Sequence, residues 1–555
     1  MCQVTEETAP VTKVMHESAP LEADYLVIGM GTAGMSFVDT LLTLDAAATV
    51  IMVDRNSRPG GHWTTAYPFV RLHQPSCNYG VNSLPLGKVR NSKGDEKFDI
   101  HDRATGREVA QYYERVADHF RQSGRVQLIF NSEHEESDDG DHTITNLSTG
   151  EVTAVSIGRK VVKIHTNLLV PSMRDGPPFD VHPAAKVVPV NDLPTQVKSG
   201  KYGKYVVIGA GKTGLDSITH LLQNGVDQSK ITWVISRDVW YFLRDGYIRE
   251  GKSYWQNASR LFTPLGKAST IKDAFLAYEK DGIMGRLDPI NRPFPEVFKG
   301  ATIDTSELEG FRTVKNVVRM GRVTSITNNS INLEQGSIQL SATDTLFVDC
   351  MADLDGSFYG YDFDEKFQVF EPGRINLGPL CTVFNPSFSS AIIAYIETTF
   401  VEDDGMKNSL LYFPRGKHAT PTPSAFFGML FAQMKTIEAL GKYPPAMKFV
   451  LNSRTNADAP LHHGGTIKFL WGMFGPHQIA KKGNAFAKKV EKGGFADVQD
   501  CFGHGRPVPE ADALKAKKNK GGNNKSKKMA VSYPPKAEAK KRIGFNCCTT
   551  INAVQ

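Results

Sequence analysis

The sequence predicts an α/β protein built on two parallel sheets. Two apolar runs, Asp24–Gly29 and Lys204–Gly209, each lead into a Gly-x-Gly-x-x-Gly turn and then into a helical segment. A second apolar run follows each helix, at Thr49–Asp54 and Ile231–Ser236. Short apolar runs joined by helices are typical of buried parallel strands. The chain therefore repeats one strand–turn–helix–strand unit.

Length and composition favour a soluble enzyme of several packed units. The 555 residues exceed one ordinary core, and the contents of 40% hydrophobic and 22% charged residues are those of globular proteins. The seven cysteines are scattered, which favours a reducing compartment over a disulfide framework. Neither a secretory signal nor an apolar run of about 18 residues is found. We expect a cytoplasmic protein with no membrane span.

The remaining expected elements are a leader, a long loop, and further helices and strands. Residues 1–21 are expected to form a disordered leader, and 58–90 a long functional loop. Thr345–Val348 is expected to return to the first sheet, which makes the second unit an insertion within the first. Asn385 and Pro386 are typical of a helix start. The other expected helices are 33–44, 107–122 and 424–440, and the other expected strands are 126–131, 143–147 and 151–156.

The C-terminal part is expected to differ from the rest. Residues 401–510 are expected to form a helical cap or an oligomer surface, so a homo-oligomer is one possibility. Lys515–Arg542 carries a charge of +10, whereas the whole chain carries +6. Residues 511–555 are therefore expected to be a disordered basic tail. Tyr533 is the one aromatic residue of the Lys515–Arg542 stretch, so we expect no nucleic-acid partner.

The first glycine turn predicts a dinucleotide site of the Rossmann type. Gly29 permits the tight turn, Gly31 allows backbone N–H groups to approach a pyrophosphate, and Gly34 allows close packing of helix on strand. Asp54 ends the next strand and can bind the ribose hydroxyls of an unphosphorylated adenosine. This combination favours FAD. The full set of expected contacts is Gly29, Gly31, Thr32, Ala33, Gly34, Asp54 and Arg55.

The second turn predicts a site for NADPH. Its strand ends in Ser236 and Arg237 instead of an acid, and these side chains can hold a 2′-phosphate that an acid would repel. Lys212 is expected to add positive charge beside the pyrophosphate. The expected contacts are Gly209, Gly211, Lys212, Thr213, Gly214, Ser236 and Arg237.

The segment Pro59–Trp63, followed by Tyr67, Pro68 and Arg71, resembles flavin-containing and Baeyer–Villiger monooxygenases. The resemblance implies a flavoprotein with two dinucleotide-binding domains. FAD is then held by 22–200 and 341–400, with contacts from Gly61, His62 and Trp63, and NADPH by 201–340. The sequence departs from the family at Phe69 and His73, where the family has Gly and an acid. Its Phe-x-Gly-x-x-x-His signature is also missing between the two turns.

Candidate catalytic residues lie in the loop 58–90, here called the flavin loop. Arg71 could stabilise an anion and His73 could transfer protons near neutral pH, or both could simply anchor the loop. By resemblance, the helix after Asn385 points its N-terminus at the flavin. Nothing at ligand spacing suggests a metal, and no cysteine pair lies in the flavin loop.

Three functions remain open on the sequence. The first is transfer of hydride from NADPH to the flavin and then to dioxygen, with monooxygenation of a small organic substrate. The second is reduction of a quinone or another small acceptor, or oxidase activity. The third is a non-catalytic protein that senses NADPH and FAD.

Overall fold

The computed structural model describes residues 20–87, 101–165, 176–247, 254–292, 294–351, 366–400, 403–414, 422–459, 482, 483, 485, 486, 488, 489 and 495. All of them lie in the first of two compact units, Met1–Pro507. The second unit, Val508–Gln555, lies outside the described residues, and so does the expected basic tail at 511–555. The expected leader at 1–21 also lies outside them up to residue 19.

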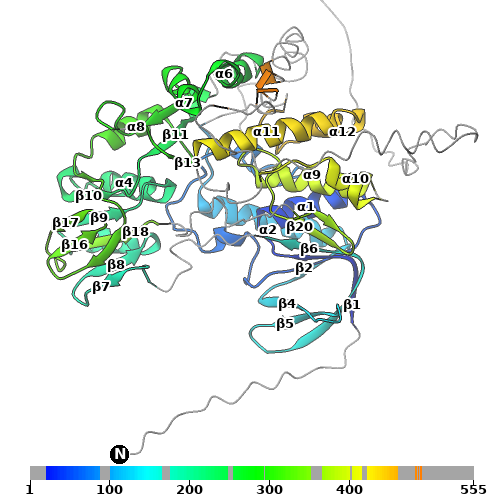
Figure 1. Cartoon of the computed structure of the whole chain (residues 1–555). Helices are drawn as coiled ribbons and strands as arrows, with labels where there is room; N and C mark the ends of the chain where they lie inside the picture. The colour runs from blue at the N-terminus through cyan, green and yellow to red at the C-terminus, as the bar shows by residue number, and fades with distance from the viewer. Residues whose placement is uncertain are drawn as a thin grey trace, which may run out of the picture. The chain divides into compact units, whose positions relative to one another are not determined.

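The first sheet contains eight strands, and its main path runs β19-β20-β6-β1-β2-β3. The strands from β20 to β3 are parallel, and β5 joins the hairpin partner β4 to β6 (Figure 1). Its strands are β1 (Leu21–Ile28), β2 (Val50–Val53), β3 (Val126–Ile129), β4 (Ser132–Glu136), β5 (His142–Asn146), β6 (Val152–Ile164), β19 (Phe370–Glu371) and β20 (Arg374–Leu377). The strands expected up to residue 156 are confirmed, whereas β4 was not expected.

The second sheet is parallel, with the order β14-β10-β9-β18-β8. Its strands are β8 (Lys186–Pro189), β9 (Lys204–Ile208), β10 (Ile231–Val234), β14 (Val317–Val318) and β18 (Thr345–Asp349). The expected return of Thr345–Val348 to the first sheet is wrong, because β18 lies between β9 and β8. The strand that returns is β20, which pairs with β6. An apolar run fits any buried parallel position, so its pattern does not identify its neighbours.

Helices α1 (Thr32–Leu44) and α9 (Pro386–Thr399) pack side by side beside the first sheet (Figure 1). Ser36 Oγ in the first turns of α1 donates to the Ser387 carbonyl at the start of α9, at 2.7 Å. At the other end of α9, Glu397 accepts from Tyr25 Oη in β1 at 3.2 Å. Because α1 runs back from the carboxyl end of β1, these two contacts make α9 parallel to α1. Both helices therefore begin at the carboxyl edge of the sheet.

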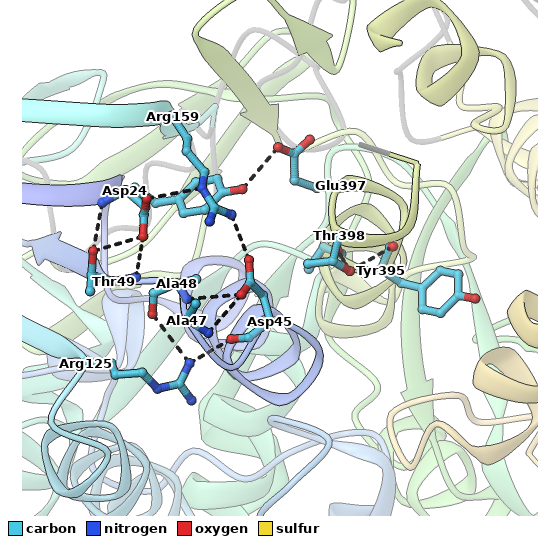
Figure 2. Close-up of polar contacts among 12 residues, drawn as sticks. Asp24, Asp45, Ala47, Ala48, Thr49, Arg125, Arg159, Tyr395, Glu397 and Thr398 are labelled. Atoms are coloured by element: carbon cyan, nitrogen blue, oxygen red, sulfur yellow. Dashed lines mark hydrogen bonds and ion pairs between the residues drawn. The ribbon is translucent and has the colours of Figure 1, made fainter. Parts of the chain in front are cut away.

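The carboxyl end of α1 is fixed by two arginines. Arg125 donates to the carbonyls of Leu42 and Asp45 at 3.0 and 2.8 Å. Arg159 forms an ion pair of 2.7 Å with the Asp45 carboxylate (Figure 2). Cations at this end suit the helix dipole. The start of α1, by contrast, has Gly31 as its N-cap and no side-chain cap.

Other helices connect and cover the sheets, and the helices expected at 107–122 and 424–440 are confirmed. These helices are α2 (Gly106–Gln122), α3 (Leu193–Ser199), α4 (Lys212–Gln223), α5 (Arg244–Tyr247), α6 (Tyr254–Lys267), α7 (Ile271–Lys280), α8 (Thr305–Arg312), α10 (Asp404–Ser409), α11 (Pro423–Leu440) and α12 (Pro444–Asn452). Two smaller sheets contain β11 (Val239–Leu243), β12 (Met284–Arg286), β13 (Val297–Ile303), β7 (Asp180–Val181), β15 (Val323–Ile326), β16 (Ser330–Leu333) and β17 (Gly336–Gln339).

Candidate functional site: two glycine turns

The first glycine turn has the backbone that its sequence requires. Gly29 has φ 106°, which favours glycine. A Cβ on Gly34 would lie 2.2 Å from the Gly29 carbonyl oxygen, so only glycine allows α1 to pack this closely on β1. No side chain caps the N–H groups at the start of α1, around Thr32 and Ala33. This arrangement leaves donors for an anion such as a pyrophosphate.

The Pro59–Trp63 segment crosses directly over this turn. Gly60 N donates to the Met30 carbonyl at 2.9 Å. A Cβ on Gly61 would lie 2.9 Å from Gly31 Cα, and both Gly60 and Gly61 have positive φ values. The two backbones therefore touch, and side chains at these positions would separate them. The structure brings Gly61, His62 and Trp63 to the first turn.

Asp54 is buried at the end of β2 and stabilises the turn. Its Oδ2 accepts from Met30 N at 2.6 Å, and its Oδ1 accepts from the Asn56 backbone and side-chain nitrogens, both at 2.8 Å. A carboxylate oxygen can accept two hydrogen bonds, so Oδ2 retains capacity for a ribose hydroxyl. Arg55 is exposed and lies 3.8 Å from Glu133 of β4.

A cluster of hydroxyl groups lies at the start of α1. Thr32 Oγ1 is 2.9 Å from Tyr79 Oη and 2.7 Å from Tyr113 Oη, and Trp63 Nε1 donates to Tyr79 Oη at 2.6 Å. Burial raises the pKa of Tyr79 above its ordinary value. Both tyrosines therefore act as neutral hydrogen-bonding groups here. Neither was predicted from the sequence, because each reaches the turn from a different part of the chain.

The second turn repeats the geometry of the first. Gly209 has φ 130°, and a Cβ on Gly214 would again lie 2.2 Å from the preceding turn carbonyl, that of Gly209. Nothing lies within 4 Å of a Cβ placed on Gly211, and α4 begins after Gly211 without a side-chain cap. The open space and uncapped N–H groups of Lys212 and Thr213 fit a second pyrophosphate.

Lys212 has a partner within its own helix. Its Nζ pairs with Asp216 Oδ1, and Asp216 Oδ2 accepts from Tyr67 Oη at 2.6 Å. Phe69 stacks on His220 of the same helix at a ring distance of 4.2 Å. The flavin loop therefore packs on α4, and the charge of Lys212 is shared with Asp216 instead of being directed only to a ligand.

A group of cations surrounds the end of β10. Ser236 and Arg237 are exposed there, and desolvation followed by repulsion from Arg237 and Arg322 lowers the pKa of Lys299. Lys299 lies in β13 and Arg322 precedes β15, so neither is near Arg237 in the sequence. Two described acids lie nearby: Asp238 is paired with Arg319 at 3.1 Å, and Glu334 Oε2 accepts from the backbone N–H of Arg322 at 3.0 Å. Positive charges that repel one another in this way suit an anionic ligand.

The two candidate catalytic residues both make contacts that anchor their loop. Arg71 is exposed and donates to the Arg103 carbonyl at 3.1 Å. His73 Nδ1 accepts from Thr302 N at 3.3 Å, and its carbonyl accepts from Arg244 Nε at 3.0 Å. Desolvation and the cations Lys212, Arg244 and Arg103 lower the pKa of His73 to about 3. A pKa this low does not suit proton transfer near neutral pH, which favours the anchoring alternative for His73.

His62 is a better candidate than His73 for a ligand contact. Its side chain is exposed, and its ring lies 5.1 Å from Trp63. Desolvation by the surrounding protein lowers the pKa of His62, which favours the neutral imidazole. A neutral imidazole can donate one hydrogen bond and accept another.

Metal-ligand clusters and reactive cysteines are two further kinds of site that the described part of the chain could contain. No group of three or more His, Cys, Asp or Glu side chains there could hold a metal ion. Cys77, Cys350 and Cys381 are free, and burial raises the pKa of each to about 12. Among the described helices, none is long and apolar enough to cross a bilayer.

Comparison with known proteins gives one clear family relation. No family model matches the chain. The uncharacterized protein Rv2000 of Mycobacterium tuberculosis is 37% identical over 396 residues, which are 70% of this chain and 70% of that protein. The polycyclic ketone monooxygenase of Thermothelomyces thermophila matches 86% of this chain and 90% of its own at 13% identity and a TM-score of 0.46. The bacillithiol disulfide reductase of Staphylococcus aureus matches 69% of this chain and 100% of its own at 13% identity and a TM-score of 0.41.

Proposed function

We propose that this chain, which belongs to the same family as the mycobacterial protein Rv2000, is an NADPH-dependent FAD oxidoreductase. The observation that carries the proposal is the pair of glycine turns. A Cβ on Gly34 or on Gly214 would lie 2.2 Å from the carbonyl oxygen of the first glycine of its turn. Helices α1 and α4 both start without a side-chain cap. One chain with two such turns is suited to two dinucleotides.

The surroundings of the first turn support FAD as its ligand. Asp54 retains acceptor capacity for ribose hydroxyls, and its negative charge disfavours a 2′-phosphate. The Gly60–Gly61 backbone lies against the turn, and α9 begins at the same edge as α1. A bound isoalloxazine ring near the start of α9 would have its reduced, anionic form stabilised by the helix dipole.

The surroundings of the second turn support NADPH. Arg237, Lys299 and Arg322 would place three cations around a 2′-phosphate, with Ser236 as a further donor. The contacts of Tyr67 and Phe69 with α4 join the flavin loop to this second site. FAD, when bound, would accept a hydride from NADPH and pass the electrons to the final acceptor. The chain's own residues bind and orient the two nucleotides.

For the final acceptor we propose dioxygen, with transfer of one oxygen atom to a small organic substrate. The high pKa values of the three described cysteines do not support a thiol relay. The resemblance of Pro59–Trp63 to monooxygenases favours oxygen. A small acceptor such as a quinone is the alternative, because Phe69 and His73 depart from the monooxygenase pattern.

The proposal is tested by visible spectroscopy of the purified protein. We expect a bound flavin spectrum that NADPH bleaches under anaerobic conditions and that air restores. A protein that takes up no FAD, or whose flavin NADPH does not bleach, would contradict the proposed oxidoreductase function. Incorporation of labelled dioxygen into a product supports oxygenation, whereas NADPH oxidation that requires an added quinone supports the reductase alternative.

The cation group at β10 predicts the choice of nicotinamide nucleotide. We expect Arg237→Ala, Lys299→Ala and Arg322→Ala each to lower kcat/KM for NADPH about tenfold, because each removes a charge-assisted contact with the 2′-phosphate. The kcat/KM for NADH, which lacks that phosphate, should change little. Steady-state kinetics with both nucleotides provides the measurement. Lys230→Ala, an exposed lysine just before the opposite end of β10, is the matched control. Equal losses of kcat/KM for NADPH and NADH would contradict the proposed contact of these cations with the 2′-phosphate.

A further inference from the structure

The loop Cys77–Leu84, here called the tyrosine loop, carries Tyr79 to the start of α1. Two helices support it. Tyr112 Oη in α2 accepts from Val81 N and donates to the Leu84 carbonyl, both at 2.7 Å. Asp39, buried in α1, accepts from Ser83 N at 3.1 Å. The loop is therefore held over the helix whose N-terminus faces the proposed FAD site.

A third support comes from a part of the chain far outside the two dinucleotide units. Arg454, just after α12, donates to the carbonyls of Cys77, Tyr79 and Leu84 at 2.5, 2.8 and 3.3 Å, and also to that of Val81. One guanidinium thus engages four carbonyls of a single loop. Its five N–H donors in a planar fork make arginine suited to this arrangement.

The residue after Arg454 joins the tyrosine loop to the start of α9. Thr455 N and Oγ1 donate to Asn82 Oδ1 at 3.1 and 2.9 Å. The Thr455 carbonyl accepts from Asn385 Nδ2 at 2.7 Å, and Asn385 is the N-cap of α9. Ser453, Thr455 and Asn456 are themselves buried. This short segment therefore binds both the loop over α1 and the N-cap residue of α9.

We propose that Ser453–Asn456 is a positioning segment of the FAD site, in which Arg454 holds Tyr79 against Thr32 and Trp63 at the first glycine turn. This inference rests on the proposed function. The hydrogen bonds of Arg454 and Thr455 described above go to the tyrosine loop and to the N-cap of α9, so the segment should act on FAD and not on NADPH. It assigns a role to the end of α12, within the region expected to be a cap or an oligomer surface.

The test is the affinity of Arg454→Met and Arg454→Lys protein for each nucleotide. We expect FAD to bind about tenfold more weakly, because loss of several charge-assisted hydrogen bonds frees the loop, and NADPH affinity to stay within about twofold. Quenching of flavin fluorescence and enhancement of NADPH fluorescence measure the two affinities. Arg125→Met is the matched control, since Arg125 also binds carbonyls of α1 but at its other end. It should leave FAD affinity within about twofold.

A gentler pair of variants decides the question if the Arg454 variants do not fold. Asn82→Ala removes the acceptor for Thr455, and Asn82→Asp keeps it, so only the alanine variant should lose FAD affinity. If wild-type protein binds FAD and these variants bind it with unchanged affinity, the inference is overturned and the proposed function stands. The same holds if the variants lose affinity for FAD and for NADPH equally. Wild-type protein that binds no FAD would overturn the proposed function and this inference together.

Discussion

Replacing Gly214 by alanine is expected to lower the rate of flavin reduction by NADPH about a hundredfold while FAD stays bound. The added Cβ would lie 2.2 Å from the Gly209 carbonyl oxygen, and that oxygen belongs to backbone that cannot swing away. Helix α4 must then move from β9, and its first N–H groups move with it. Loss of flavin absorbance after anaerobic mixing with NADPH measures the rate.

Two further variants separate this effect from general damage. Gly34→Ala makes the same clash at the first turn, so it should reduce FAD content instead. Gly310→Ala adds a Cβ in helix α8, where nothing lies within 4 Å, and should change neither property. Reduction of Gly214→Ala protein at the wild-type rate would show that the second turn does not hold the reducing nucleotide.

The parts of the site that the sequence predicts are those set by local geometry. A glycine with positive φ, a helix packed on a strand, or an N-cap such as Asn385 depends on residues within one turn of chain, so spacing reveals it. The sequence could also have predicted the ion-pair partner of Lys212, because Asp216 lies four residues further along the same helix.

The parts that it does not predict depend on tertiary structure. Lys299 and Arg322 lie more than sixty residues after Arg237 in the chain, and Arg454 reaches the tyrosine loop from even further away. The position of β18 depends on which sheet buries it, and its apolar pattern suits either sheet. The anchoring of His73 likewise needs Thr302 and Arg244, which no motif connects to it.

A buried group of four charges anchors the far end of α9 and predicts the largest effect on stability. Glu397 and Lys407 are 6% and 2% exposed and form an ion pair, and Lys160 lies 3.7 Å from Glu397 and 2.6 Å from Asp404. Two lysines and two acids make the group neutral. Figure 2 shows Glu397 among the polar contacts drawn at this end of α9.

Glu397→Gln keeps the shape of the side chain but leaves the group with a net positive charge in a poorly solvated place. Breaking a buried pair in this way costs about 3–5 kcal/mol, which corresponds to a fall of about 3–5 °C in Tm for a unit the size of Met1–Pro507. Thermal unfolding followed by circular dichroism measures it. Asp118→Asn removes an acid from an exposed pair with Arg121 and should shift Tm by less than about 1 °C.

The double variant Glu397→Gln with Lys407→Met tests whether charge balance is the cause. It restores neutrality, because Lys160 and Asp404 remain as a pair at 2.6 Å. Its Tm should therefore lie above that of Glu397→Gln alone, which is non-additive behaviour expected only of directly coupled groups. If the two substitutions instead lower Tm additively, Glu397 and Lys407 stabilise α9 through packing and hydrogen bonds, and neutrality of the four-charge group is not what holds the helix against β1 and β6.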